Sequence, residues 1–255
     1  MKKHIGYTSE LFVMRDDRIY KYTNDSARIS FMKEQMNHLK LIASKDSIIA
    51  PRNIEWHEEP GRWGYLMEYI DNAERIEDYH LPQVFELINV CANLQSDKEI
   101  PSFTTYINYL KDVINKNTDV FEKDELDLLQ KYYDTLKKYT QDFDLFKSTS
   151  HGDFTMENIL VSGDRLVLID PIYKEGMWSS WLQDIAKFYQ NIYFNDMKKT
   201  FEFSQLVPKN EYPEIFRLIH LLMIANYIRM FPYIKKNFIV YYQRYAEFQI
   251  LLKIL

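Results

Sequence analysis

Cysteine, glycine and proline are all scarce in this chain, which has 1 cysteine, 6 glycines and 8 prolines among 255 residues. The single cysteine, Cys91, cannot form an intramolecular disulfide, which is typical of proteins from a reducing compartment. The N-terminal residues MKKHIGYTSE lack the apolar run of a signal peptide. The longest uncharged apolar stretch, residues 218–228, is too short to cross a bilayer. These absences predict a soluble protein of the cytoplasm without insertion in a membrane.

A surplus of positive charge is missing as well. Lys and Arg number 32 and Asp and Glu number 37, so the net charge is −5. Nucleic acids and anionic membranes attract basic surfaces, and this balance supports neither of them as a partner. What the chain has in quantity is hydrophobic residues, which make up 46% of the total. That share is sufficient for the core of one large or two small domains.

The first 70 residues have the short β-prone runs typical of a sheet. ELFVMRDDRIYKYT, residues 10–23, predicts a hairpin that turns at two aspartates. Further strands are expected in SIIAP, NIEWHEE and WGYLMEYI, and Pro60-Gly61 marks a turn between the last two. The stretch 28–45 predicts a helix, because its apolar residues recur at steps of three and four.

From about residue 80 the apolar spacing is that of helices. We expect helices at 82–95, 103–116, 122–139, 180–195, 212–229 and 235–253. They are interrupted by ENILVSGDRLVLID, residues 157–170, which predicts a β-hairpin. The predicted class is therefore α+β with two lobes: a small sheet-rich lobe with one helix at 1–70, and a larger, mainly helical lobe at 71–255.

Three polar residues around this hairpin, Asp153, Asn158 and Asp170, are of the types found in metal-dependent active sites. Asn158 stands at the entry of its first strand and Asp170 at the exit of its second, so antiparallel pairing brings them side by side. Their oxygens are of the kind that Mg²⁺ prefers, and Asp153, in the loop before them, would accept a proton from an attacking hydroxyl. The alternative is that the three are a turn residue, a strand cap and a loop start.

HGDFTMEN, residues 151–158, resembles the H-x-D-x-x-x-x-N catalytic loop of protein-kinase-like enzymes. The loop has a glycine after the histidine, and in this it resembles the aminoglycoside phosphotransferase and choline kinase branch of that family. The resemblance implies that Asp153 is the catalytic base and that Asn158 and Asp170 hold Mg²⁺. It also implies that His151 braces the loop, and that Asp184, in WLQDIAK, supports the loop from a helix.

The same resemblance implies a nucleotide-binding role for the first lobe. A strand lysine of the family pairs with a helix glutamate and contacts the phosphates of ATP, and Lys21 and Glu34 fit that pattern. For Lys21 alone, a surface side chain that extends its charge into water is the ordinary alternative. For Glu34, a position among mostly apolar residues is costly unless a cation lies beside it.

Two further segments correspond to the nucleotide site of the family. IGYTSELF stands where the phosphate loop belongs but has one glycine, so the backbone N–H groups of Tyr7, Thr8 and Ser9 are expected to bind the phosphates. LMEYID resembles the hinge between lobes, where adenine would bond to backbone groups of Glu68 and Tyr69 or Ile70. A buried final strand is compatible with that role.

The acceptor is expected to be a small hydroxyl compound: a sugar, an amino alcohol or an aminoglycoside. A protein kinase needs a longer activation segment than the short stretch between Asp170 and Asp184, and no A-P-E-like sequence closes it. Trp178 and Trp181 are expected to line the acceptor pocket. The alternatives are a Ser/Thr protein kinase, a non-catalytic protein that kept the fold, and a nucleotidyl-transferring enzyme.

Overall fold

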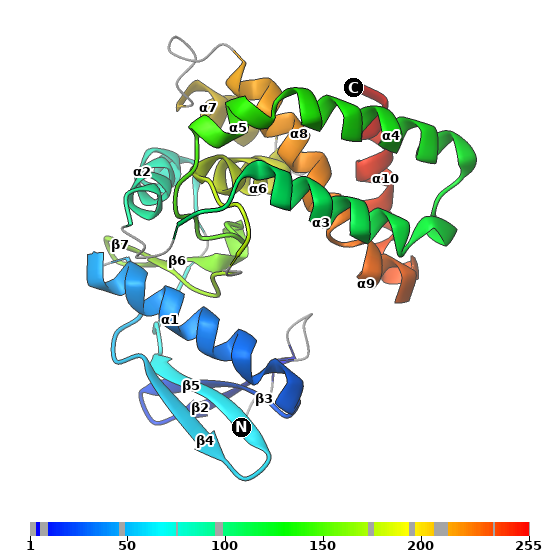
Figure 1. Cartoon of the computed structure of the whole chain (residues 1–255). Coiled ribbons are helices and arrows are strands. Elements are labelled where there is room, and N and C mark those ends of the chain that lie inside the picture. The colour runs from blue at the N-terminus through cyan, green and yellow to red at the C-terminus, as the bar shows by residue number, and fades with distance from the viewer. Residues whose placement is uncertain are drawn as a thin grey trace. The chain divides into compact units, whose positions relative to one another are not determined.

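The computed structural model describes residues 4–5, 10–45, 49–74, 76–94, 99–172, 176–193, 197–206, 214–236 and 238–254. It divides into two compact units, both drawn in Figure 1. The first, here called the sheet unit, comprises Met1–Leu94 and His151–Lys174. The second, the helical unit, comprises Gln95–Ser150 and Glu175–Leu255.

The sheet unit is built on a five-stranded antiparallel sheet with the order β1-β2-β3-β5-β4. Its strands are β1 (His4–Ile5), β2 (Leu11–Arg15), β3 (Arg18–Thr23), β4 (Glu55–Glu59) and β5 (Arg62–Glu68). The predicted hairpin is present, since Arg15 pairs with Arg18 across a two-residue turn. Asp16 there has a φ of 55°, a left-handed conformation that aspartate tolerates. SIIAP is not a strand in its described part, 49–51.

Helix α1 (Ile29–Lys45) contacts strands β3, β4 and β5. It follows a 3₁₀ turn, η1 (Ser26–Arg28), in which the Ala27 N–H is capped by the carboxylate of Asp25. The side chains that α1 buries are Met32, Gln35, Met36, His38, Leu39 and Ile42. They lie on one face of the helix because residues three and four apart share a face.

The hairpin of β6 (Ile159–Ser162) and β7 (Arg165–Leu168) belongs to the sheet unit, as does α2 (Leu81–Ala92). The Leu168 N–H donates to Ile49 C=O at 2.8 Å, and Glu74 and Val161 exchange two backbone hydrogen bonds. These bonds tie the hairpin to segments near the sheet. The boundaries between the units therefore differ from the predicted lobe boundary at residue 70.

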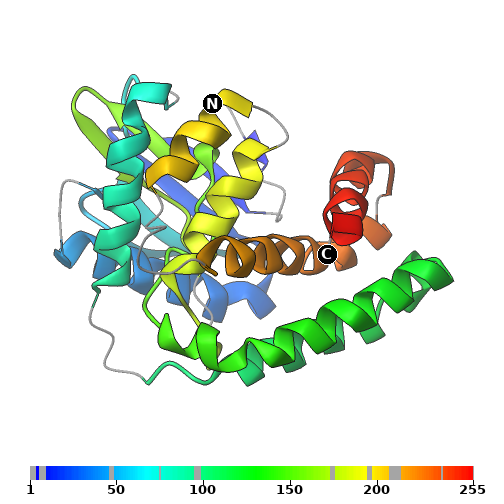
Figure 2. The same cartoon turned by 90° about the horizontal axis from the view of Figure 1, so that it is seen from above.

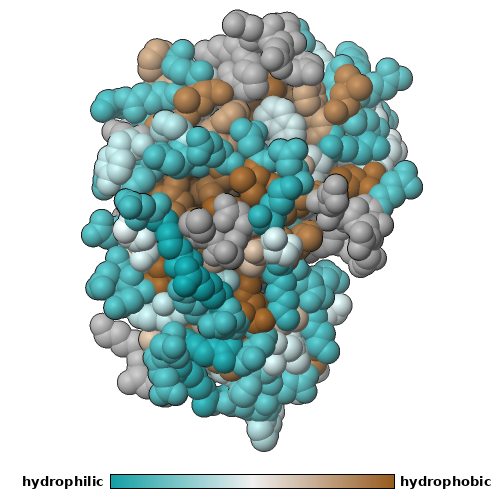
Figure 3. All heavy atoms as spheres, turned by 90° about the vertical axis from the view of Figure 1, so that its left-hand side faces the viewer, coloured by the Kyte–Doolittle hydropathy of each residue, from teal (hydrophilic) through white to brown (hydrophobic). Residues whose placement is uncertain are grey.

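The helical unit consists of α3 (Phe103–Asn115), α4 (Lys123–Lys138), α5 (Thr140–Leu145), α6 (Trp181–Tyr193), α7 (Met197–Leu206), α8 (Ile215–Ile228), α9 (Phe231–Lys236) and α10 (Phe238–Ile254). Helices α3 and α4 run beside one another in both views of the ribbon (Figures 1 and 2). The predicted long helices are present, whereas the short α5, α7 and α9 were not predicted. On the face shown in Figure 3, apolar side chains appear as separate patches among polar ones.

One apolar stretch, Ile215–Ile234, has the length and composition of a membrane span, contrary to the expectation that no stretch is long enough. Within the 18-residue segment of this stretch that meets the criterion of hydropathy, 67% is buried inside the protein. A core helix meets the same criteria of length and composition, so this stretch is weak evidence for a membrane segment. The predicted α+β class, with a small antiparallel sheet and a mainly helical remainder, is confirmed.

Candidate active site

The loop 151–158 is held against the segment that follows β7. The Ile172 N–H donates to His151 C=O at 2.9 Å, and Gly152 has a φ of 82°. A Cβ atom at Gly152 would lie 1.9 Å from the carbonyl oxygen of Ile172, which is far inside van der Waals contact. Only glycine satisfies both the left-handed conformation and this close approach. The local backbone therefore explains why glycine follows the histidine.

His151 is fully buried beneath this loop. Its Nε2 atom lies 2.9 Å from the carbonyl oxygen of Ile169, so Nε2 carries the hydrogen and donates it. Burial lowers the pKa of His151 to about 4, although the nearby Asp153 carboxylate acts in the opposite direction. The imidazole is therefore neutral at neutral pH. It links the loop to the strand end before Asp170.

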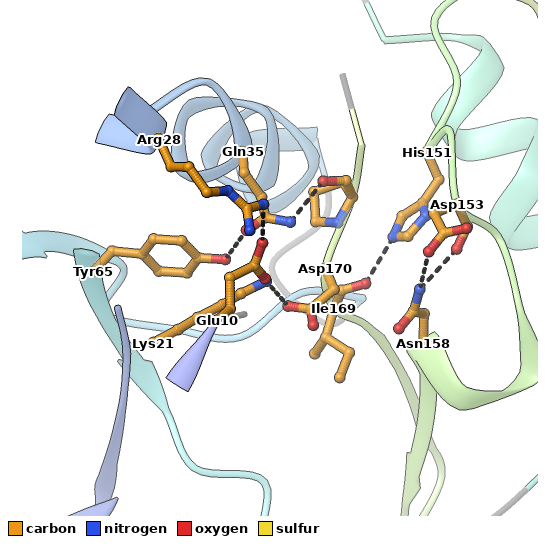
Figure 4. A network of polar contacts seen from close by, with 11 residues as sticks. Glu10, Lys21, Arg28, Gln35, Tyr65, His151, Asp153, Asn158, Ile169 and Asp170 are labelled. Carbon is orange, nitrogen blue, oxygen red and sulfur yellow. Dashed lines mark hydrogen bonds and ion pairs between the residues drawn. The ribbon is translucent and has the colours of Figure 1, made fainter. Parts of the chain in front are cut away.

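Asn158 and Asp153 are joined directly within the loop (Figure 4). The Nδ2 group of Asn158 donates to the backbone oxygen of Asp153 at 2.8 Å and to its Oδ2 atom at 3.1 Å. These two bonds fix the orientation of the amide. Its Oδ1 atom consequently points away from Asp153, toward the side on which Asp170 lies (Figure 4).

Asp170 lies at the same end of the hairpin as Asn158. The neighbouring Ile169 N–H donates to Asn158 C=O at 3.0 Å, which continues the β6–β7 ladder by one bond. Asp170 itself has a φ of 56°, so the chain leaves the strand there in a left-handed conformation. Such conformations in non-glycine residues are held by their surroundings and gather at functional sites. Here the surroundings include an ion pair.

That ion pair is with Lys21 on β3. The Lys21 Nζ atom lies 2.9 Å from Asp170 Oδ1 and 2.8 Å from Glu10 Oε2, and its side chain is 1% exposed. Burial alone would lower the pKa of Lys21, but its neighbours Tyr65, Asp170 and Glu10 raise it above the usual lysine value. The ammonium group is thus a stable buried cation between two carboxylates. It is not a surface charge.

The predicted ion pair between Lys21 and Glu34 is wrong. Among the described side chains, the ion-pair partners of Lys21 are Glu10 and Asp170. Glu34 is only half-buried, and its carboxylate accepts a hydrogen bond from the Ser30 hydroxyl at 3.4 Å. The reason is the orientation of α1. Gln35 lies on the buried face of the helix, and because successive residues are rotated by about 100° around the helix axis, Glu34 lies away from that face.

Gln35 takes the inward position instead. Its Nε2 group donates to Pro171 C=O at 3.0 Å, and its Oε1 atom accepts from the Tyr65 hydroxyl at 3.0 Å. Tyr65 is fully buried and is the cross-strand partner of Lys21. Glu10, Arg28, Gln35 and Tyr65 were not identified from the sequence. A signal existed only for Gln35, which is three residues after Met32 and four before Leu39 on the apolar face.

Similarity to solved structures identifies the fold that carries this site. No protein-family model and no curated protein matches the sequence. Solved structures do match: choline kinase LicA from Streptococcus pneumoniae has a TM-score of 0.67 at 14% identity, covering 100% of this chain and 94% of that one. The aminoglycoside phosphotransferase APH(3'')-Id from Streptomyces rimosus, in complex with ADP and streptomycin, has a TM-score of 0.62 at 12% identity, with coverages of 88% and 91%. A GDP and kanamycin complex of an APH(2") enzyme has a TM-score of 0.71 at 10% identity, with coverages of 99% and 91%.

The chain has the protein-kinase-like fold. The resemblance seen in HGDFTMEN is therefore confirmed at the level of fold.

The segment expected to form the hinge follows β5. The Glu68 N–H donates to Arg52 C=O at 2.9 Å, and the Tyr69 N–H donates to Asp17 C=O at 3.1 Å. Both donors are therefore engaged, whereas the N–H of the buried Ile70 has no partner among the described residues. Of the N–H groups expected to meet adenine, that of Ile70 is the available one. Tyr7, Thr8 and Ser9 of the expected phosphate loop lie outside the described residues.

Asp184 and the two tryptophans lie in the helical unit. Asp184 is fully buried in the first turn of α6, not exposed as an ordinary helix position would be. Trp178 is 2% exposed and contacts the rings of Phe103 and Phe143, with centroids 4.6 and 5.7 Å away. The expectation that Trp178 lines a pocket is therefore wrong, because the apolar ring is used in the core. Trp181 is half-buried beside Phe146.

The donor set suits a hard divalent cation. Asp170 offers a carboxylate with a side chain that is 23% exposed, and Asn158 offers an amide oxygen whose orientation is fixed. No cluster of three or more His, Cys, Asp or Glu side chains that would hold a metal occurs in the described part of the chain. Mg²⁺ needs no such cage when a substrate phosphate completes its coordination. The residues present fit Mg²⁺ bound together with a nucleotide.

Proposed function

We propose that the protein is a phosphotransferase that moves the terminal phosphoryl group of a nucleoside triphosphate to a hydroxyl group of a small molecule. The observation that carries the proposal is that one compact unit holds the Lys21–Asp170 ion pair next to the Asp153–Asn158 loop. The protein-kinase-like fold supports it, as do the similar structures, which are described as a choline kinase and aminoglycoside phosphotransferases. We place this activity in the cytoplasm, where nucleoside triphosphates are available.

Asp153 is proposed as the catalytic base. Its carboxylate would accept the proton of the acceptor hydroxyl while the hydroxyl oxygen forms a bond to the terminal phosphorus. The bond between that phosphorus and the bridging oxygen breaks, and the nucleoside diphosphate leaves with the bond's electron pair. Asn158 serves this step by holding the Asp153 carboxylate at 3.1 Å. His151, neutral and buried, would orient the loop through its N–H bond to Ile169 C=O and would not transfer a proton in the reaction.

Lys21, Asn158 and Asp170 are proposed to bind the donor. The buried ammonium group of Lys21 would contact phosphate oxygens, and its charge is worth most where water is excluded. Asn158 and Asp170 would hold Mg²⁺, which when bound neutralises charge on the phosphates as the transfer proceeds. Glu34 is no longer part of this group, because it does not meet Lys21. Asp184, which is buried in α6, is proposed to have a structural role and no direct part in the reaction.

The donor and the acceptor are each proposed as a class. Backbone groups after β5, with the N–H of Ile70 foremost, would bind a purine, and ATP is the proposed donor. GTP is the alternative, because one similar structure contains ADP and another contains GDP. The acceptor would be an amino alcohol, a sugar or an aminoglycoside, in keeping with the choline kinase and the streptomycin and kanamycin complexes.

An acceptor screen tests this proposal. The full chain is incubated with Mg²⁺ and ATP or GTP, and with single members of the three acceptor classes or a mixture of Ser/Thr peptides. We expect ADP or GDP release that depends on one small-molecule class and yields a phosphorylated product by mass spectrometry. Phosphorylation of peptides alone would favour the protein-kinase alternative. Transfer of a nucleotidyl group would be visible as pyrophosphate release and would refute phosphoryl transfer.

A further inference from the structure

We infer that Glu10 is the positioning residue of the phosphate-binding Lys21, in the place that a helix carboxylate was expected to take. This inference rests on the proposed phosphotransfer function, because it gives Lys21 a role with the nucleotide. It assigns a role to a residue that no pattern in the sequence singled out. Arg28 is included in the inference as the residue that fixes Glu10.

Glu10 is buried and contacts two cationic side chains. Its Oε2 atom lies 2.8 Å from Lys21 Nζ, and its Oε1 atom lies 2.7 Å from Arg28 Nη2. The side chain is 6% exposed. Both carboxylate oxygens are therefore engaged, each with a different cation (Figure 4), and of these two cations Lys21 is buried whereas Arg28 is 23% exposed. Such a buried pair is held firmly, since removing one partner leaves an uncompensated charge.

Asp170, the other carboxylate that contacts Lys21, is placed so that it could exchange Lys21 for a metal cation as its partner. Its side chain is 23% exposed, against 6% for Glu10, and only its Oδ1 atom pairs with Lys21. A lysine has three N–H donors and no acceptor. If Asp170 held a divalent cation with this oxygen, one N–H donor of Lys21 would become available for a phosphate oxygen. Glu10 contacts Lys21 and Arg28 through separate oxygens and would therefore keep its bond to Lys21.

Helix α1 contributes hydrogen bonds to this cluster and no charge. The inward residue Gln35 is neutral, and it reaches Lys21 only through the Tyr65 hydroxyl. Glu10 immediately precedes β2, Lys21 lies on β3 of the same hairpin, and Arg28 ends the 3₁₀ turn η1 that follows it. The placement of the phosphate-binding lysine is therefore built into one local segment, residues 10–28. It does not depend on a carboxylate that α1 would bring.

The experiment compares Glu10→Gln with Glu34→Gln, which removes the carboxylate expected from the sequence, and with Glu55→Gln. Glu55 pairs with Arg18 at 2.6 Å on the same sheet but is 58% exposed, so it is the matched ion-pair control. The acceptor found in the screen, kcat, both KM values and the affinity for Mg·ADP are measured for each. Thermal unfolding reports whether each variant is folded.

We expect Glu10→Gln to lower kcat at least tenfold, with the KM of the acceptor within twofold of wild type. Glu10→Asp should recover part of the loss, Arg28→Gln should show a smaller loss of the same kind, and Glu34→Gln and Glu55→Gln should be near wild type. In a Lys21→Met background, Glu10→Gln should cause no further loss, because its partner is gone. This non-additivity is a result that a merely structural role would not give.

Three results would overturn the inference. The first is a large loss for Glu34→Gln with none for Glu10→Gln. The second is tighter Mg·ADP binding with unchanged kcat in Glu10→Gln, which would show that Glu10 competes with the phosphates. The third is an equal, additive loss in the Lys21→Met background. Failure of the proposed function is seen separately, as wild-type protein that binds Mg·ADP but transfers to no acceptor, and the affinity comparison still decides the role of Glu10.

Discussion

Lys21 shows how a single buried residue organises the site. A buried ammonium ion is costly unless carboxylates offset the lost hydration, and here Glu10 and Asp170 do so at 2.8 and 2.9 Å. The same arrangement that makes the charge tolerable in the fold brings it next to the proposed metal ligand. Stability and function are therefore coupled at this residue.

The substitution Lys21→Met should damage both properties. Two carboxylates would face each other without their cation, so we expect the free energy of unfolding to fall by about 3–5 kcal/mol. The specificity constant for the nucleotide should fall by about 100-fold or more, as with the loss of one electrostatic group in phosphoryl transfer. Denaturant unfolding and steady-state kinetics measure the two effects. A loss no larger than that of Glu55→Gln, for which exposed pairs predict about 0–1 kcal/mol, would contradict the buried cation.

His151 should make stability depend on pH. Its pKa is lowered to about 4 in the folded protein from 6.5, so below pH 6.5 the unfolded chain binds a proton that the folded one refuses. The unfolding free energy should therefore fall as the pH drops from 6.5 to 4, by about 3 kcal/mol in total. Above pH 6.5 this contribution is fully present.

Unfolding free energies of wild type and His151→Gln at several pH values isolate this effect. Glutamine keeps an N–H donor for Ile169 C=O but cannot take up the proton. The variant should therefore lose the extra slope between pH 6.5 and 4. Equal slopes in the two proteins would show that His151 is not the buried neutral group described here.

Sequence reasoning identified some site residues and not others for a physical reason. Asp153, Asn158 and Asp170 stand in one short segment, where local spacing decides which side chains meet. The partner of Lys21 depends on which residue of a helix faces a sheet, and the sequence pattern did not separate Glu34 from Gln35. Glu10 lies immediately before its strand, where no periodicity marks it.

At the scale of elements, the loop 151–158 and the β6–β7 hairpin form one piece held by backbone contacts. The loop lies against residue 172, and the hairpin end is extended by the bond from Ile169 to Asn158. Gly152 is the point of closest approach. The position of Asp153 thus depends on a residue that carries no functional group.

Gly152→Ala and Gly163→Ala make a matched pair. Both glycines have positive φ, but a Cβ at Gly163 meets nothing within 4 Å, whereas one at Gly152 would lie 1.9 Å from Ile172 O. Gly163→Ala should cost only the left-handed conformation, about 1–2 kcal/mol. Gly152→Ala should cost clearly more, because the backbone must move, and should also lower kcat. Similar unfolding free energies for the two variants would contradict the described contact.

The predicted helices agree with the structure where the apolar repeat is long. The ranges 103–116, 122–139 and 180–195 correspond to α3, α4 and α6 within two residues at each end. Helices α5 and α9 have 6 residues each, which is too short for a repeat to be recognised. The expected strand SIIAP fails in its described part because an apolar run alone does not specify β structure.

At the scale of the whole molecule, the chain order does not coincide with the compact units. The hairpin 159–168 follows three of the helices of the helical unit in sequence but belongs to the sheet unit, through backbone bonds to Ile49 and Glu74. Such long-range bonds leave no trace in local pattern. The α+β class followed from the sequence, whereas the boundaries of the units required coordinates.

The helical unit has its own core, and Trp178 belongs to it. Trp178→Ala should lower the free energy of unfolding by about 3–5 kcal/mol, as for other large-to-small changes of buried aromatic residues. Trp181→Ala, at a half-buried position, is the control and should cost less. Denaturant unfolding of both variants checks this. A small loss for Trp178→Ala, accompanied by a raised KM for the acceptor, would restore the role as a pocket residue.

The central claim, that Asp153 is the base of a phosphotransferase, is tested most directly by Asp153→Asn. Acceptor-dependent ADP release and Mg·ADP affinity are measured on the same preparations of wild type and variant. The account predicts a fall in kcat of about 100-fold or more, the range typical of general-base loss, with Mg·ADP affinity within a few-fold of wild type. A variant that retains most of its kcat, or that loses transfer and nucleotide binding together, would contradict it.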